Sequence, residues 1–376
     1  MGSNRHMPLL TPAERRALRR QCPHIVTGFT TLTPAEEFAA MAAWCEAQQA
    51  EHDMYGEGAL VEGFEARVAG LLGKPAAVFM PSGVMAQLAA VRIWTEQARL
   101  PRFGLHATSH LAQHEEQAFE ALLQCHGVVL GHALRPLLAG DLAACRQPLA
   151  CLLVELPIRE AGGQLPSWDE LTELSAAARE RGIALHMDGA RLWESVAFYG
   201  RPHAEVAALF DSVYVSVYKG IGGVAGAVLA GSEDFVAQAR LWRRRFGGTL
   251  HHLSPMVVSA AMRFDERLAL MPALYARTVA FAEMLNAVPG LRVNPGLPHT
   301  NMFHLYVDAP MDALMAARDA LGAETGHWLL DHIRAAEVPG WSLSELYLGD
   351  RLLSLDDAVL APLYARLLSD ARQVPR

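Results

Sequence analysis

Lysine is almost absent from this chain of 376 residues. Of its 32 lysine and arginine residues, only Lys74 and Lys219 are lysines. A surface lysine is replaced by arginine at little cost, but a guanidinium stays protonated at physiological pH and cannot attack a carbonyl carbon as an amine does. The scarcity therefore draws attention to the chemistry of the two lysines that remain.

Other absences narrow the class of protein. The five cysteines are odd in number and have neither C-x-x-C nor zinc-like spacing, so we predict reduced thiols in a cytoplasmic protein, with no disulfide framework and no metal site. No apolar run approaches about 18 residues without a charge, and the opening "MGSNRHM" is typical of a vector remnant rather than a signal peptide. The net charge of -8 argues against a nucleic-acid binder, despite the basic run "RLWRRRF" at 240–246.

Short apolar runs alternate with helical patterns through the middle of the chain. The segment 168–182 lies between the apolar runs 149–156 and "IALHMD" (183–188). Its apolar residues recur at helical spacing, and it ends in glycine. This alternation predicts an α/β fold, a mostly parallel central sheet covered by helices, with ligands at the carboxyl ends of the strands. The other predicted strands are 76–80, 149–156, 211–217 and 225–231.

The pattern changes near residue 265, where a long helical stretch begins. A strand-like run, "TNMFHLYVD" (300–308), and a final helix near 356–370 follow it. We predict an N-terminal arm over 1–48, a large domain over 49–264 and a smaller α+β domain over 265–376. No internal repeat or low-complexity linker is visible, which favours closely packed domains.

Lys219 directly follows the predicted strand 211–217 and precedes the glycine-rich "GIGGVAG". Burial and neighbouring cations would lower its pKa and suit it to form a Schiff base; a lysine in a surface turn is the alternative. Asp188 ends another predicted strand. It could cap the following helix, or it could pair with the protonated pyridine nitrogen of pyridoxal phosphate and keep that ring an electron sink.

A third pattern, "FMPSGVMAQ" (79–87), is a strand followed by Ser-Gly and a helical run. Backbone N–H groups at the start of a helix, beside a glycine that permits close approach, form an anion site suited to a phosphate. Such turns also occur in α/β proteins that bind no ligand there. The pattern therefore supports a phosphate site only together with Lys219 and Asp188.

In order and spacing, these segments resemble the threonine aldolase and β-eliminating lyase family, pyridoxal-phosphate enzymes of fold type I. The resemblance runs from "MYGEG" (54–58) through "FMPSGVMAQ", "HMDGARLW" and "SVYKGIGG" to "TNMF" (300–303). It implies that Lys219 binds the cofactor covalently and that Asp188 pairs with the pyridine nitrogen. It also implies a phosphate cup formed by Ser82, Gly83 and Val84.

The same resemblance implies roles for further residues. His110 would stack on the cofactor ring, and Arg191 would contact the cofactor and hold the substrate carboxylate by two parallel hydrogen bonds; an ion pair with a neighbouring acid is the alternative for Arg191. We assign Tyr55 and Arg159 to substrate binding. Fold type I enzymes generally share active sites between subunits, which implies a homodimer or homotetramer with Tyr55 and the loop 243–252 at its interface. A core aromatic residue and a solvated helix end are the alternatives for these two.

The chain also departs from the family pattern. Val84 stands where the family usually has threonine, and His251 stands where it often has arginine. The segment 157–160 lacks the histidine that aldolases place there for the β-hydroxyl proton. Leu346 occupies the position of a second carboxylate-binding arginine, and the nearby Arg351 is out of register.

These observations lead to one functional hypothesis with two alternatives. We predict a pyridoxal-phosphate lyase that cleaves a β-hydroxy-α-amino acid to glycine and an aldehyde, with Lys219, His110 and Asp188 as its catalytic residues. The alternatives are β-elimination or other Cα chemistry on a different amino acid, and a non-catalytic binding module. We expect a cytoplasmic homo-oligomer with a small amino-acid substrate and no nucleic-acid or membrane partner. The sequence leaves open the substrate, its stereochemistry and a monovalent cation site.

Overall fold

The computed structural model of the chain describes residues 9–373, so the vector-like start "MGSNRHM" lies outside the described residues. The described chain divides into two compact units. The larger unit comprises residues 32–271, and the smaller comprises 9–31 together with 272–373. The division falls at Pro272, inside the long helix α12 (Ser254–Asn286).

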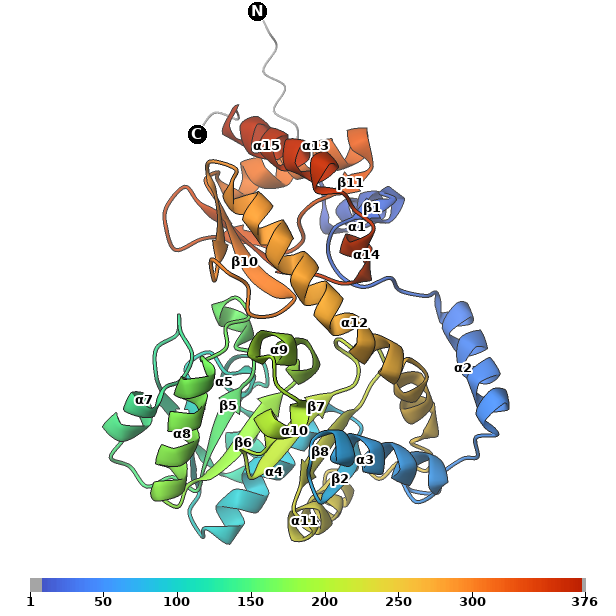
Figure 1. Cartoon of the computed structure of the whole chain (residues 1–376), viewed down its shortest axis with the longest axis vertical. Coiled ribbons are helices and arrows are strands. Elements are labelled where there is room, and N and C mark those ends of the chain that lie inside the picture. The colour runs from blue at the N-terminus through green and yellow to red at the C-terminus, as the bar shows by residue number, and fades with distance from the viewer. Residues whose placement is uncertain (1–8, 374–376) are drawn as a thin grey trace, which may run out of the picture. The chain divides into compact units, whose positions relative to one another are not determined.

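The larger unit is built on a seven-stranded sheet with the strand order β2-β8-β7-β6-β5-β3-β4 (Figure 1). Strand β8 (Ala227–Gly231) runs antiparallel to both of its neighbours, and the remaining pairs are parallel. The prediction of an α/β fold with a mostly parallel central sheet is therefore confirmed. The other strands are β2 (Ala76–Met80), β3 (Arg102–His106), β4 (His126–Leu130), β5 (Cys151–Glu155), β6 (Ala184–Gly189) and β7 (Ser212–Ser216).

Strands β3 and β4 were not predicted from the sequence. Each contains a glycine, Gly104 or Gly127, which weakens the strand signal. Both glycines lie where packing is tight: an added Cβ would come within 2.7 Å of Leu152 Cδ1 at Gly104 and within 2.8 Å of Leu105 Cδ2 at Gly127. Close packing against side chains of the neighbouring strands thus selects glycine where strand propensity alone would select against it.

Helix α4 (Gly83–Gln97) is the element that connects the site to the core. Its buried residues enter two hydrophobic clusters, one with β2, β7, β8 and α11 (Glu233–Arg245), the other with β3, β5 and α6 (Ala118–Leu123). This packing on both sides fixes the position of the helix N-terminus. The other helices of the unit are α2 (Pro34–Gln48), α3 (Ala59–Leu71), α5 (His110–Gln113), α7 (Ala139–Ala144), α8 (Trp168–Glu180), α9 (Leu192–Tyr199) and α10 (His203–Ala207), with a short 3-10 turn η1 (Arg159–Ala161).

The smaller unit has a four-stranded antiparallel sheet, with the order β12-β13-β10-β9, and its own hydrophobic core. A short parallel pair joins β1 (His24–Ile25) to β11 (His327–Trp328) and so ties the first described residues into this unit. The α+β character predicted for the C-terminal part is confirmed. The remaining elements are β9 (Leu291–Asn294), β10 (Met302–Val307), β12 (Ile333–Ala335), β13 (Ser342–Tyr347), α1 (Pro12–Gln21), α13 (Met311–Thr325), α14 (Asp350–Leu353) and α15 (Asp357–Gln373).

Within residues 9–373, α12 is the one helix long and apolar enough to cross a membrane by length and composition. The core helix of a soluble protein passes the same test, so this helix is weak support for a membrane span.

Candidate functional site

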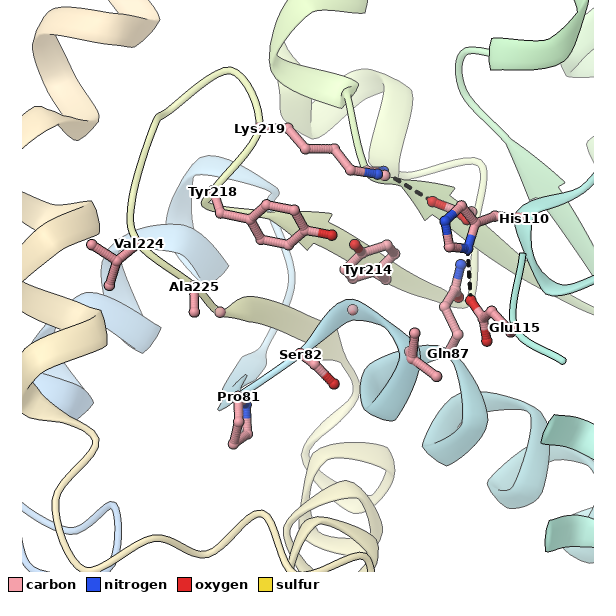
Figure 2. Close-up of a pocket in the computed structure, with 15 residues that line it drawn as sticks. Pro81, Ser82, Gln87, His110, Glu115, Tyr214, Tyr218, Lys219, Val224 and Ala225 are labelled. Carbon is pink, nitrogen blue, oxygen red and sulfur yellow. Dashed lines mark hydrogen bonds and ion pairs between the residues drawn. The ribbon is translucent and has the colours of Figure 1, made fainter. Parts of the chain in front are cut away.

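A cavity of about 230 Å³ opens in the larger unit where strands β2, β6 and β7 end (Figure 2). Its lining includes the predicted residues Ser82, Gly83, Val84, His110, Asp188 and Lys219. These residues come from four separate stretches of the chain, and the parallel sheet brings them together at one edge.

The N-terminus of α4 forms one wall of this cavity. Ser82 caps the helix, with its Oγ accepting a hydrogen bond of 3.2 Å from the Met85 N–H. Gly83 is required by sterics, because a Cβ there would lie 2.2 Å from the Tyr214 hydroxyl oxygen. The unpaired N–H groups of the first turn and the positive end of the helix dipole make this wall a site for an anion.

Lys219 enters the cavity from the turn that follows β7. Burial is the main cause that lowers the pKa of Lys219 to about 8, and the positive charge of Arg191 adds to the effect. The carboxylates of Asp188, Glu194 and Glu155 act in the opposite direction. The amine is therefore much closer to its nucleophilic, uncharged form at neutral pH than an exposed lysine.

Asp188 lies buried at the carboxyl end of β6, beside Tyr214 of β7 in the sheet register. Its Oδ1 accepts a hydrogen bond of 3.0 Å from the Ala190 N–H. On the neighbouring strand, burial and the Asp188 charge raise the pKa of Glu155 well above its usual value. Two carboxyl groups at adjacent strand ends thus share the site, with the proton favoured on Glu155.

His110 faces the cavity from the first position of α5. Its Nδ1 lies 2.9 Å from Glu115 Oε1, and its backbone N–H donates to Glu155 Oε1. The imidazole side chain is 38% exposed, whereas the Glu115 side chain is only 2% exposed. The second oxygen of Glu115, Oε2, has no hydrogen-bond partner.

A buried chain of hydrogen bonds also ends at the cavity. Trp94 Nε1 donates to Ser212 Oγ at 2.8 Å, Ser212 Oγ lies 2.8 Å from His186 Nδ1, and His186 Nε2 lies 2.7 Å from Gln87 Oε1. Burial lowers the pKa of His186 to about 3, so the ring is neutral. Because the Gln87 Oε1 atom only accepts, His186 Nε2 carries the ring hydrogen, and the bare Nδ1 of the neutral ring accepts from the Ser212 hydroxyl. The Gln87 amide nitrogen is left buried and unpartnered on the cavity side.

Several cavity residues were missed by reasoning from the sequence. Tyr214 and Tyr218 line the cavity, their hydroxyls hydrogen-bond to each other, and burial raises the pKa of both. Tyr214 had a signal, since in β7 it alternates with the valines at 213 and 215 and so faces away from them. Gln87 had no local signal, because its role depends on His186 of the distant strand β6. Glu115 pairs with His110, five residues before it, and its burial is visible only in the structure.

Three predicted residues do not line this cavity. Arg191 precedes α9, and its positive charge acts to lower the pKa of Lys219 and of Tyr218. Tyr55 lies in a separate hollow bordered by Arg240 and Arg243, and its backbone N–H donates 2.9 Å to the His251 carbonyl.

The third of these residues is Arg159, which lies in the turn η1 with its guanidinium 3.9 Å from Glu160. Glu160 Oε1 also lies 3.1 Å from His114 Nε2. Over the described part of the chain, no group of three or more His, Cys, Asp or Glu side chains is placed to hold a metal ion.

Comparisons with known proteins identify the family of the chain. A crystal structure from Listeria monocytogenes, provisionally named an L-allo-threonine aldolase, superposes with a TM-score of 0.89 at 37% identity, covering 95% of this chain and 99% of that one. Low-specificity L-threonine aldolase 1 of Arabidopsis thaliana is 26% identical over 277 residues, 71% of this chain and 77% of the relative. A serine palmitoyltransferase from S. paucimobilis with bound PLP, at 16% identity, shares the fold alone, with a TM-score of 0.66 and 93% and 87% coverage. Residues 30–309 match the profile of the β-eliminating lyases, and the chain belongs to this β-eliminating lyase family.

Proposed function

We propose that this protein is a pyridoxal-phosphate lyase of the threonine aldolase type, which cleaves a β-hydroxy-α-amino acid to glycine and an aldehyde. One observation carries the proposal. A single cavity holds a lysine whose pKa is lowered to about 8, a buried carboxylate at Asp188 and the N-terminus of α4. The threonine aldolase names of the Listeria and Arabidopsis relatives support the same reaction class.

The residues of the cavity fit pyridoxal phosphate. The N-terminus of α4 at Ser82, Gly83 and Val84 would receive the phosphate, and Asp188 would pair with the pyridine nitrogen. Two buried atoms without partners, Gln87 Nε2 and Glu115 Oε2, indicate that bound polar groups complete the site. When bound, pyridoxal phosphate supplies an electron sink for the bond that is cleaved at Cα.

Three side chains would have separate roles in the reaction. Lys219 would bind the cofactor carbonyl and afterwards deliver a proton to Cα, which yields glycine. Arg191 would hold the substrate carboxylate and so select which bond at Cα lies perpendicular to the ring. His110 would accept the proton of the β-hydroxyl group, because it lines the cavity. The segment where aldolases place a histidine for this proton has the buried Ile158 instead.

We also propose a cytoplasmic homodimer or homotetramer with shared active sites. The half-exposed ring of Tyr55 meets the His251 ring edge-on, with centroids 5.2 Å apart, and neither residue lines the cavity of its own chain. Such a pair is suited to contact the site of a second copy. In this proposal Tyr55 and Arg159 contribute to substrate binding from the edge of the completed site.

An amino-acid panel tests the proposed function. Purified protein loaded with pyridoxal phosphate is incubated with threonine, an aromatic β-hydroxy amino acid and an acidic one, and aldehyde, glycine, ammonia and keto acid are measured. We expect equal amounts of aldehyde and glycine. Leu346 stands where aldolases carry a second carboxylate-binding arginine. KM for threonine should therefore be about ten- to a hundredfold higher than in an aldolase that holds the carboxylate with two arginines. Ammonia with keto acid would instead indicate β-elimination, and no product from a loaded protein would indicate a binding module.

The lowered pKa of Lys219 predicts a pH dependence for cofactor uptake. Only the uncharged amine attacks a carbonyl, so the uptake rate should rise about tenfold per pH unit at acidic pH and level off above about pH 8. Stopped-flow absorbance of cofactor-free protein mixed with pyridoxal phosphate measures this rate. Arg191→Met removes a charge that lowers the pKa and should move the plateau to higher pH. A rate that still climbs at pH 10 in the unmodified protein would contradict the prediction.

A further inference from the structure

Glu115 is a buried acid whose two carboxylate oxygens have different surroundings. Its side chain is 2% exposed, it lines the cavity, and one oxygen holds His110 Nδ1 at 2.9 Å while the other has no partner. Figure 2 shows the pair side by side at one end of the cavity, with the dashed line joining the His110 ring to the Glu115 carboxylate.

This contact determines which nitrogen of His110 carries hydrogen. An ionised carboxylate only accepts hydrogen bonds, so the Nδ1 atom that faces Glu115 carries the hydrogen. In a neutral imidazole the lone pair is then on Nε2. The exposed part of the ring faces the cavity, where a substrate hydroxyl group would lie.

The backbone after Glu115 is strained in a way that maintains this contact. Glu116 and Gln117 have φ values of 49° and 53°, two successive non-glycine residues in the left-handed region. Such conformations are costly for residues with a Cβ and persist where the surrounding structure imposes them. The turn directs the Glu115 side chain inward while Glu116 stays exposed.

The other ionisable groups near His110 are occupied by other contacts. The His114 ring lies 5.1 Å from the His110 ring, but its Nε2 contacts Glu160. Glu155 accepts from the His110 backbone N–H and not from the ring. Ile158 offers no base. Glu115 is therefore the carboxylate paired with the imidazole.

We propose that Glu115 is a positioning residue for the proton transfer at the substrate hydroxyl group. It fixes His110 with hydrogen on Nδ1 and stabilises the imidazolium that forms when Nε2 takes the hydroxyl proton. As the O–H bond breaks, the oxygen electron pair would form the aldehyde C=O bond and the Cα–Cβ bond would break. Pyridoxal phosphate, held by Lys219, Asp188 and the N-terminus of α4, would supply the electron sink until Cα is protonated. The inference rests on the proposed retro-aldol function.

The test compares two reactions of one enzyme. Cleavage of an aromatic β-hydroxy amino acid needs the hydroxyl-side proton transfer, whereas exchange of the glycine α-hydrogen with solvent deuterium does not. Glu115→Gln keeps the side-chain shape and removes the charge, and the adjacent, exposed Glu116→Gln is the matched control. In Glu115→Gln we expect kcat for cleavage to fall on the order of a hundredfold, with KM and glycine exchange within about threefold. Glu116→Gln should match the unmodified protein.

A second measurement needs neither the cofactor nor a variant of Glu115. In the unmodified, cofactor-free protein, the ¹⁵N spectrum of labelled histidine should show His110 with hydrogen on Nδ1, identified by its loss in His110→Gln. Hydrogen on Nε2 would overturn the inference, as would unchanged cleavage by Glu115→Gln. Equal losses of cleavage and exchange would show a purely structural role and also overturn it. Absence of glycine exchange in the unmodified, loaded protein would overturn the proposed function and this inference with it.

Discussion

Replacing Lys219 with alanine is expected to abolish turnover and the covalently fixed cofactor together. The variant should lose the yellow absorbance that borohydride reduction otherwise fixes to the protein. The loss of proton transfer to Cα alone should lower kcat by roughly 10²- to 10⁴-fold. The physical reason is that no other lysine lines the cavity and arginine cannot act as the nucleophile. Absorbance spectra before and after reduction, with turnover of the best substrate in the panel, measure both effects.

Lys74 provides the matched control. It is the other lysine of the chain, burial also lowers its pKa, and its Nζ donates to the Phe210 carbonyl oxygen. Lys74→Arg should leave absorbance, reduction and turnover intact. Mass spectrometry of the two lysine-containing peptides locates the reduced adduct, and an adduct on Lys74, or none on either peptide, would refute the pyridoxal-phosphate proposal.

Asp188→Asn should separate cofactor binding from catalysis. Asparagine keeps the shape and can still accept from the Ala190 N–H, but it removes the charge that would keep the pyridine nitrogen protonated. We expect the cofactor to remain bound while kcat falls by about 10²- to 10³-fold, the size of effect seen when one well-placed electrostatic group is removed. Equilibrium dialysis with pyridoxal phosphate and steady-state kinetics give the two quantities.

Asp211→Asn is the corresponding control at the opposite end of the sheet. Its carboxylate accepts a hydrogen bond of 2.7 Å from the Leu185 N–H, and Asp211 lies just before β7 rather than at the carboxyl end of a strand. This variant should lower thermal stability and leave kcat nearly unchanged. If Asp188→Asn behaved in the same way, Asp188 would serve only as a structural acceptor.

The sequence predicted the parts of the fold whose signal is local. Strands β5, β6 and β7 are almost wholly buried, and their continuous apolar runs reveal them. Strands β3 and β4 carry glycines selected by close packing against neighbouring strands, so they have no such run. The pairing of β1 with β11 joins residues about 300 positions apart, and no local pattern signals it.

The same distinction applies to the candidate site. Lys219 and Asp188 follow or end predicted strands, and residues at strand ends meet at one edge of a parallel sheet. Gln87 and Glu115 could not be found in this way, because neither stands at a strand end. The partner of Gln87, His186, is supplied by a distant strand, and the pairing of Glu115 with His110 depends on its burial. Glu115 was one of two adjacent glutamates in the sequence, and only the structure shows that Glu115 is buried while Glu116 is exposed.

The hydrogen-bonded chain from Trp94 to Gln87 connects the cavity to an indole side chain. Each link fixes the direction of the next hydrogen bond, and such chains polarise cooperatively. A molecule that accepts a hydrogen bond from the Gln87 amide therefore also strengthens the bond at the indole of Trp94, outside the cavity lining. We therefore expect the Trp94 indole N–H to respond when the cavity is filled, although Trp94 does not line it.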